Sequence, residues 1–234
     1  TLCMPVLQAG AAGADPAVLE AARAQQPAVI QALDHMVHIE SGSDDARGLE
    51  KMSAYVQGRL RALGAKVDVV AATPGKAPGL VRGSFAGDGK LRIALIAHMD
   101  TVYHRGILET EPFRRDGNRL YGPGIADAKG GIAVILHALE VLQQLGWKDY
   151  ARLTVLFNAD EEIGSPGSGS IIETLGAAND VVLSYEPSPS AAVAGGTTGV
   201  LLQTAGTATA TLHVHGRAAH AGAADAAMVS APPV

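Results

Sequence analysis

The sequence predicts an α/β protein whose main domain has three layers around a largely parallel sheet. Two observations support this fold class. Short apolar runs rich in β-branched residues alternate with segments of helical periodicity, which is typical of a parallel sheet covered by helices. Three of these runs are also nearly continuous, as expected of strands that are buried on both faces, and they span residues 91–97, 153–157 and 180–185.

Helices are expected before the first strand. Residues 16–39 have helical periodicity, and Pro27 within them should either break the helix or occupy a first turn. The serine and two aspartates at residues 43–45 are a capping signal for an amphipathic helix over residues 46–63. Gly64 is expected to end that helix.

The rest of the main domain alternates between strands and helices. In addition to the three apolar runs, we predict strands over 65–71 and 79–85, helices over 130–145 and 170–175, and a long polar loop over 101–124. After residue 187 the composition shifts to Ala, Gly and Thr. Alternation over 207–214 suits an antiparallel strand, so a second, smaller α+β domain is expected to begin here.

Composition excludes several function classes. Hydrophobic residues make up 47% of the 234 residues, which is ample for a core, and no apolar stretch of the sequence is long enough to span a bilayer. The net charge is −5, and Lys and Arg form no cluster of the kind that binds nucleic acid. The single cysteine, Cys3, supplies neither an intrachain disulfide nor a cysteine-based metal cluster. We therefore expect neither a nucleic-acid partner nor a membrane partner.

Residues 1–14 are small and apolar and end in Ala-Gly-Ala before Asp15. This composition resembles the end of a secretory signal peptide with its cleavage site. A disordered leader rich in Ala and Gly has the same composition. The first interpretation predicts a periplasmic or secreted protein, whereas the second leaves a cytoplasmic location open.

Acidic and histidine side chains follow the ends of the three apolar runs. His98 and Asp100 follow the first run, Glu161 and Glu162 the second, and Glu186 the third. In open α/β sheets the binding crevice lies outside the carboxyl ends of the strands, so these side chains are expected to converge. Together they predict the site of a hydrolase that uses two metal ions.

The spacing suggests roles, each with a structural alternative. His98 can bind a metal through one ring nitrogen while Asp100 accepts a hydrogen bond from the other, or the two can form a buried structural pair. Glu161 and Glu162 diverge in extended chain, so one can be a ligand and the other a general base; a solvated acidic turn is the alternative. Asp127, just before a predicted helix, can bridge two metals or cap the helix.

The joint pattern resembles a known family. The motifs that carry the resemblance are residues 96–103, 121–127 with 129–131, 158–165 and 184–187. They resemble the zinc-dependent family of glutamate carboxypeptidases, aminoacylases and dipeptidases. The similarity is greatest to the glutamate carboxypeptidases of the carboxypeptidase G type, which release C-terminal glutamate from folates and similar N-acylated glutamates. It covers residues 26–223.

The resemblance implies a site with two zinc ions. By its motifs, His98, Asp127 and Glu186 would hold the first zinc, and Asp127 would bridge to a second zinc held also by Glu162. Because the ligands are oxygen and imidazole without thiolate, Co²⁺ or Mn²⁺ could replace Zn²⁺.

The resemblance also implies catalytic roles. Glu161 would be the general base, and Asp100 would orient the histidine ligand. His220 matches a histidine of the lid domain that reaches the active site, often that of a partner subunit, and helps to stabilise the oxyanion. The implied reaction is hydrolysis of an amide in N-acyl amino acids or peptides that carry a free C-terminal carboxylate. An aminoacylase or deacetylase activity stays open, and a homodimer is implied.

Two features depart from the family pattern. Ala128 stands where the most similar relatives carry a second Asp, and no counterpart of a downstream histidine ligand or of a substrate-binding arginine precedes Val234. We therefore expect residues 15–190 to be the N-terminal part of a catalytic metal-binding domain and residues 191–234 to begin an incomplete lid or dimerisation domain. The alternative hypothesis is a truncated, inactive family member that binds at most one metal or a protein partner.

Overall fold

The computed structural model describes residues 15–73, 79–187 and 211–213, and the chain divides into the units Thr1–Pro187 and Ser188–Val234. The expected leader and His220 lie outside the described residues. Residues 211–213 form no strand, and the rest of the strand expected over 207–214 is also outside the described part. The interpretations of these segments stay predictions.

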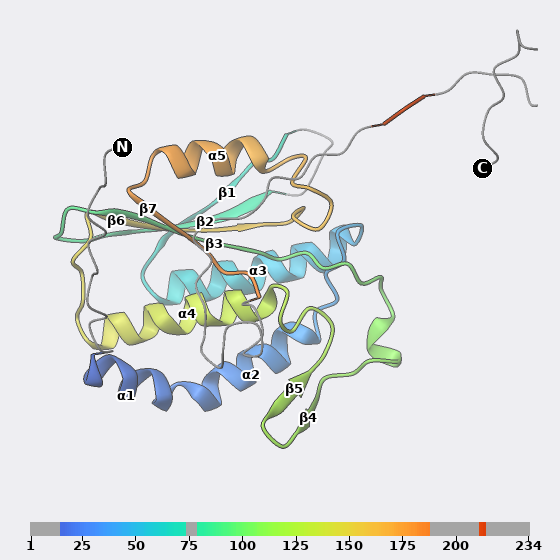
Figure 1. Ribbon diagram of the computed structural model, residues 1–234, viewed down its shortest axis with the longest axis horizontal. Helices are drawn as coiled ribbons and strands as arrows, with labels where there is room; N and C mark the ends of the chain where they lie inside the picture. Colours follow the sequence, from blue (N-terminus) through green and yellow to red (C-terminus); the bar gives the residue numbers. More distant parts are fainter. Residues whose placement is uncertain (1–14, 74–78, 188–210, 214–234) are drawn as a thin grey trace, which may run out of the picture. The chain divides into compact units, whose positions relative to one another are not determined.

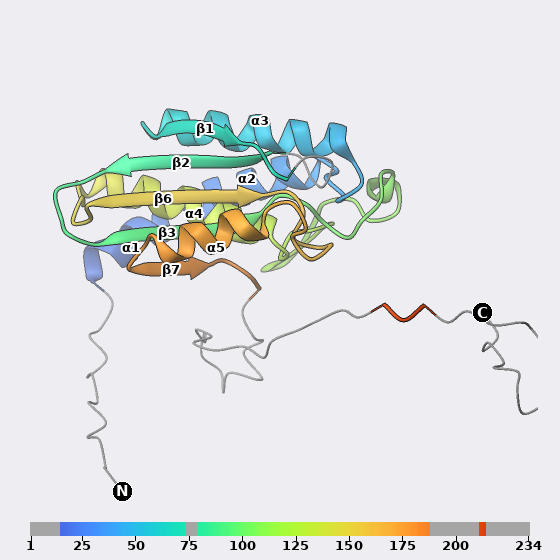
Figure 2. The same ribbon diagram turned by 90° about the horizontal axis from the view of Figure 1, so that it is seen from above.

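Within the part of the chain that the structure describes, one five-stranded sheet forms the centre of the first unit, with strand order β1-β2-β6-β3-β7 (Figure 2). The strands are β1 (Lys66–Val70), β2 (Leu80–Ala86), β3 (Arg92–His98), β6 (Arg152–Asn158) and β7 (Val181–Ser184). β3 pairs in parallel with β6 and β7, whereas β2 pairs antiparallel with β1 and β6. All strands except β2 therefore run in one direction, which confirms the predicted largely parallel α/β fold.

Helices cover both faces of this sheet, giving three layers (Figure 1). On one face α3 (Ala46–Ala62) and α4 (Lys129–Gln144) pack against the sheet, and α1 (Pro16–Ala24) and α2 (Gln26–Val37) pack on α4. The other face carries α5 (Gly169–Ala177). Among the described residues, none of these helices combines the length and the apolar character that crossing a bilayer requires.

The helix boundaries have local causes in the sequence. Asp15 caps α1 by accepting hydrogen bonds from the first-turn amides, and Pro27 lies in the first turn of α2, so the periodic segment 16–39 is two helices. The side chain of Asp45 accepts a 2.8 Å hydrogen bond from the Gly48 amide and caps α3. Gly64, with φ of +79°, follows the end of α3 as expected.

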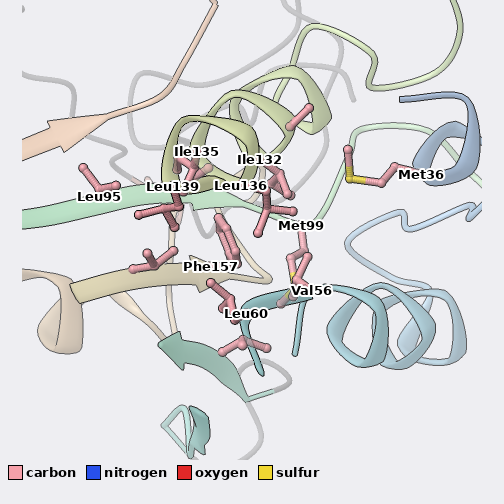
Figure 3. Packing of buried hydrophobic residues seen from close by; sticks show 14 of the residues in the cluster. Met36, Val56, Leu60, Leu95, Met99, Ile132, Ile135, Leu136, Leu139 and Phe157 are labelled. Atoms are coloured by element: carbon pink, nitrogen blue, oxygen red, sulfur yellow. The ribbon is translucent and has the colours of Figure 1, made fainter. Parts of the chain in front are cut away.

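The main core lies between the sheet and α2, α3 and α4 (Figure 3). Phe157 on β6, Leu136 on α4 and Leu60 on α3 are fully buried in it. A smaller cluster around Leu156 lies on the opposite face, where α5 covers it. Burial on both faces explains the nearly continuous apolar run of β6.

The prediction that all three apolar runs are buried was wrong for β7. Val181, Val182 and Leu183 are 37–42% exposed. Within the described residues β7 lies at one edge of the sheet and pairs with β3 alone.

The polar segment 101–124 also has more structure than was predicted. It contains a short 3₁₀ helix, η1 (Ile107–Glu109), and a hairpin of β4 (Arg114–Asp116) and β5 (Arg119–Tyr121). The guanidinium of Arg114 lies 3.6 Å from the centre of the Tyr121 ring, and this cation–π contact joins the two strands. The strands have no alternating apolar residues that would have predicted them.

Replacing Phe157 with alanine is expected to lower the free energy of unfolding by about 3–5 kcal/mol, because the side chain is fully buried and leaves a cavity. Urea denaturation followed by circular dichroism measures the change. The matched control is Val134→Ala on α4, where the side chain is 50% exposed. That variant should stay within about 0.5 kcal/mol of the wild type. Equal losses in the two variants would contradict the placement of the core.

Candidate metal centre

The candidate site lies at the carboxyl ends of three adjacent parallel strands. His98 is the last residue of β3, while Glu161 and Glu162 follow β6 and Glu186 follows β7. The register pairs His98 with Asn158, so the ends of β3 and β6 lie level with each other. Asp127 precedes α4 and completes the group. The topology thus explains why residues far apart in sequence meet at one edge of the sheet.

His98 is the centre of this group. Its Nε2 atom lies 2.9 Å from Asp127 Oδ1, 3.5 Å from Glu186 Oε2 and 3.9 Å from Glu161 Oε2. The imidazole is buried, whereas these three carboxylates are about half exposed. One face of the site is therefore packed against the protein, and the other is open to ligands.

The donor atoms fit a metal ion. His98, Asp127 and Glu162 each offer one ligand atom, and these atoms all lie within 4.8 Å of one another. One imidazole with carboxylate oxygens and no thiolate suits zinc, and also cobalt or manganese. Glu186 faces the same imidazole nitrogen and is available as a further ligand.

The charge balance of the site also fits a cation. Burial, followed by the repulsion of neighbouring carboxylates, raises the pKa of Glu161 and of Glu162 above the usual value. Among the residues that the structure describes, no Lys or Arg forms an ion pair with any of these carboxylates or with Asp127 and Glu186. A bound metal ion would supply the missing positive charge.

Asp100 connects His98 to the two glutamates. Its carboxylate is fully buried and accepts hydrogen bonds from the backbone amides of Glu161 and Glu162, each at 3.1 Å. His98 Nδ1 lies 3.0 Å from the backbone carbonyl of Asp100 and 3.4 Å from its carboxylate Oδ1. Asp100 thus contacts the imidazole through its main chain as well as its side chain, and its carboxylate holds the turn that carries both glutamates.

Asp160 is the first acidic residue of the segment Asp160-Glu161-Glu162, but its carboxylate does not join the group around His98. It is buried, and its carboxylate accepts hydrogen bonds from the amides of Gly167 and Ser168 and from the Ser168 hydroxyl. These bonds close the loop that follows β6. No role for Asp160 was predicted from the sequence. The Gly/Ser-rich loop that follows is the feature of the sequence that could have indicated a residue needed to close it.

Lys129 is a second residue that sequence reasoning left without a role. It is buried at the start of α4, and its Nζ atom donates to the carbonyls of Ile39, at 3.0 Å, and Pro123, at 3.4 Å. Burial lowers its pKa to about 8. The side chain joins the loop before Asp127 to the end of α2.

The contacts of Asp127 show whether its side chain caps α4, which is the structural alternative to binding a metal. The N-cap position of α4 is Ala128, and the Asp127 carboxylate is hydrogen-bonded to His98. Ala128 is fully buried, and the peptide bond between Asp127 and Ala128 is cis. The described hydrogen bonds of the Asp127 carboxylate therefore do not include a cap of α4.

The affinity for zinc is expected to rise with pH. Burial lowers the pKa of His98, but hydrogen bonds and charges from Asp100 and Glu186 outweigh burial and raise that pKa to about 11. Below that pH the metal-free imidazole holds a proton that zinc must displace. The apparent affinity should therefore rise about tenfold per pH unit from about pH 6 to about pH 8. Competition with a zinc indicator of known pH dependence measures this slope, and an affinity independent of pH would contradict the account.

The sequence is similar to several known proteins. Residues 94–231 match peptidase family M20/M25/M40. The chain is 43% identical over 215 residues to carboxypeptidase G2 of Pseudomonas sp. (strain RS-16), covering 90% of this chain and 49% of that protein. It is 35% identical over 100 residues to acetylornithine deacetylase of Myxococcus xanthus, covering 42% and 25% respectively. The chain thus spans about half the length of the carboxypeptidase and a quarter of the length of the deacetylase.

Solved structures show the same fold. Human carnosine dipeptidase 1 superposes with a TM-score of 0.61 at 20% identity, over 72% of this chain and 40% of that one. The M20 family metallo-carboxypeptidase Sso-CP2 from Sulfolobus solfataricus superposes with a TM-score of 0.57 at 21% identity, over 67% and 37%.

Proposed function

Because the chain belongs to peptidase family M20/M25/M40, we propose that it hydrolyses an amide bond in N-acyl amino acids or peptides with the help of metal ions, and that it releases C-terminal glutamate from folate-type substrates. The observation that carries this proposal is the convergence of His98, Asp127 and Glu162, whose ligand atoms lie within 4.8 Å of one another. The 43% identity to carboxypeptidase G2, over most of the chain, favours a carboxypeptidase over a deacetylase.

The proposed cofactor is a pair of zinc ions. His98, Asp127 and Glu186 would hold one ion, and Asp127 with Glu162 would hold the other. When bound, the ions supply a Lewis acid that polarises the scissile carbonyl and lowers the pKa of water. The imidazole is buried and the carboxylates are partly exposed. This arrangement supports the assignment, because the exposed side of the site leaves room for both metal and substrate.

Glu161 is the proposed general base. Its carboxylate lies 3.9 Å from His98 Nε2, beside the ligand group, and its burial raises its pKa towards the range in which a carboxylate can accept and return a proton. It would take the proton of the attacking water and deliver it to the leaving amine. Asp100 would keep Glu161 in place through the hydrogen bond to its amide.

The remaining parts of the proposal concern partners. The substrate would carry a free C-terminal carboxylate, and the enzyme would be a homodimer in which His220 steadies the oxyanion. These assignments follow from the family resemblance.

The proposal is tested with the purified chain loaded with zinc. Glutamate release from para-aminobenzoyl glutamate is measured beside deacetylation of N-acetylornithine. We expect zinc-dependent release of glutamate and little deacetylation; the reverse preference would contradict the proposed substrate class.

A second candidate function is metal binding without turnover, which the three convergent ligand atoms of His98, Asp127 and Glu162 would support by themselves. Stoichiometric zinc binding without hydrolysis of either substrate would support this candidate over the first.

A further inference from the structure

We propose that Ser43 is a positioning residue of the metal centre, which acts on Glu161 and Glu162 through Asp100. The inference rests on the proposed function, because it assigns Ser43 a task in that same site. The segment 43–45 has the sequence of a helix cap, but Asp45 alone caps α3. The hydroxyl of Ser43 is thus not used by the helix.

The hydroxyl is used by the carboxylate of Asp100. Ser43 Oγ donates to Asp100 Oδ2 at 2.8 Å, and the same oxygen accepts the amide of Glu162 at 3.1 Å. The other oxygen, Oδ1, accepts the amide of Glu161 at 3.1 Å. Because Asp100 is fully buried, each of these bonds restricts the carboxylate.

The backbone of Ser43 is held in register with the end of β3. Its amide donates to the carbonyl of Thr101 at 3.1 Å, and the amide of Thr101 donates to the carbonyl of Ser41 at 2.9 Å. Between them, Gly42 forms a parallel bridge with Thr101. A Cβ atom on Gly42 would lie 2.3 Å from the carbonyl oxygen of Tyr103, so this close approach requires glycine. The hydroxyl is therefore presented to Asp100 by a fixed piece of chain.

The consequence is a continuous set of hydrogen bonds from Ser43 to both glutamates. Without the hydroxyl, Asp100 Oδ2 would keep one donor, and the carboxylate would be held less firmly against the Glu161-Glu162 turn. Partners behind the metal ligands orient those ligands, and their loss commonly weakens metal binding by about 10–100-fold. For Ser43→Ala we expect a loss near the lower limit, about tenfold, because the two amides still hold Asp100.

The test is the zinc affinity of the whole chain, measured by competition with a zinc indicator at constant pH. Ser43→Ala should weaken binding about tenfold. Ser43→Thr and Ser43→Val have nearly the same shape and differ in the hydroxyl, so threonine should bind zinc like the wild type and valine like alanine. Ser43 lines an open cavity of about 480 Å³, which leaves space for the added methyl group.

The control is Ser53→Ala on α3, whose hydroxyl accepts a hydrogen bond from Gln57 and is not part of the Asp100 network. It should bind zinc like the wild type. Urea denaturation of each metal-free variant separates a loss of affinity from a loss of stability, since a purely structural role would lower stability in alanine and valine without changing the affinity of the folded protein.

Two results would overturn the proposal while leaving the proposed function intact. One is an affinity of Ser43→Ala within twofold of the wild type. The other is equal affinities of the threonine and valine variants, since the hydroxyl would then have no role. Absence of zinc binding by the wild type is a different result, because it would remove the proposed function together with this inference.

Discussion

Replacing Glu161 with glutamine is expected to lower kcat for para-aminobenzoyl glutamate by about 10²–10⁴-fold, while the protein keeps its bound zinc. The amide has nearly the shape of the carboxylate but cannot accept the proton of the attacking water. Glu161 Oε2 lies 3.9 Å from His98 Nε2. The three ligand atoms that converge come from His98, Asp127 and Glu162, so the metal should stay bound without the Glu161 carboxylate. Steady-state kinetics and elemental analysis on the same preparation measure both quantities.

The matched control for this variant is Glu173→Gln, an exposed glutamate on α5. Its kcat should equal that of the wild type. Turnover of Glu161→Gln at the wild-type rate would remove the general-base assignment. Simultaneous loss of zinc would show instead that Glu161 is itself a ligand.

Replacing Asp127 with alanine is expected to weaken zinc binding by more than about a hundredfold, beyond the range seen for partners behind the ligands. Asp127 Oδ1 lies 2.9 Å from His98 Nε2, so its carboxylate and the imidazole face the same point. The N-cap position of α4 is Ala128, and we therefore expect little loss of stability from this change. Competition with a zinc indicator measures the affinity, and urea denaturation measures the stability.

Asp116→Ala is the control for that variant, since Asp116 is an exposed aspartate on the β4–β5 hairpin. Its zinc affinity should be that of the wild type. If Asp127→Ala bound zinc normally but lost stability, Asp127 would have a structural role at the start of α4.

The parts of the fold that the sequence predicted are those with a local signal. The strand β6 has a continuous apolar run because it is buried on both faces, and α3 has its cap and its terminal glycine. β7 has the same kind of run, yet it lies at an edge of the sheet that the described residues form. Strand order is decided by pairing between distant segments, so the exposure of β7 could not be read from its own residues.

The candidate site follows the same division. His98, Glu162 and Glu186 could be selected because each follows a predicted strand, and parallel strands bring their ends to one edge. The bond from Ser43 to Asp100 and the bond from Lys129 to Ile39 join residues 57 and 90 positions apart. Such contacts leave no periodicity in the sequence, and for this reason the residues that hold the site in place were missed.

The most direct test of the account is the zinc content per chain, determined by elemental analysis after dialysis against a zinc buffer. Wild-type protein and the Asp127→Ala variant are compared, with stability measured in parallel. The account predicts one or two zinc ions per wild-type chain and none in the variant. A wild-type protein that is folded and holds no zinc would contradict the assignment of His98, Asp127, Glu162 and Glu186 as a metal centre.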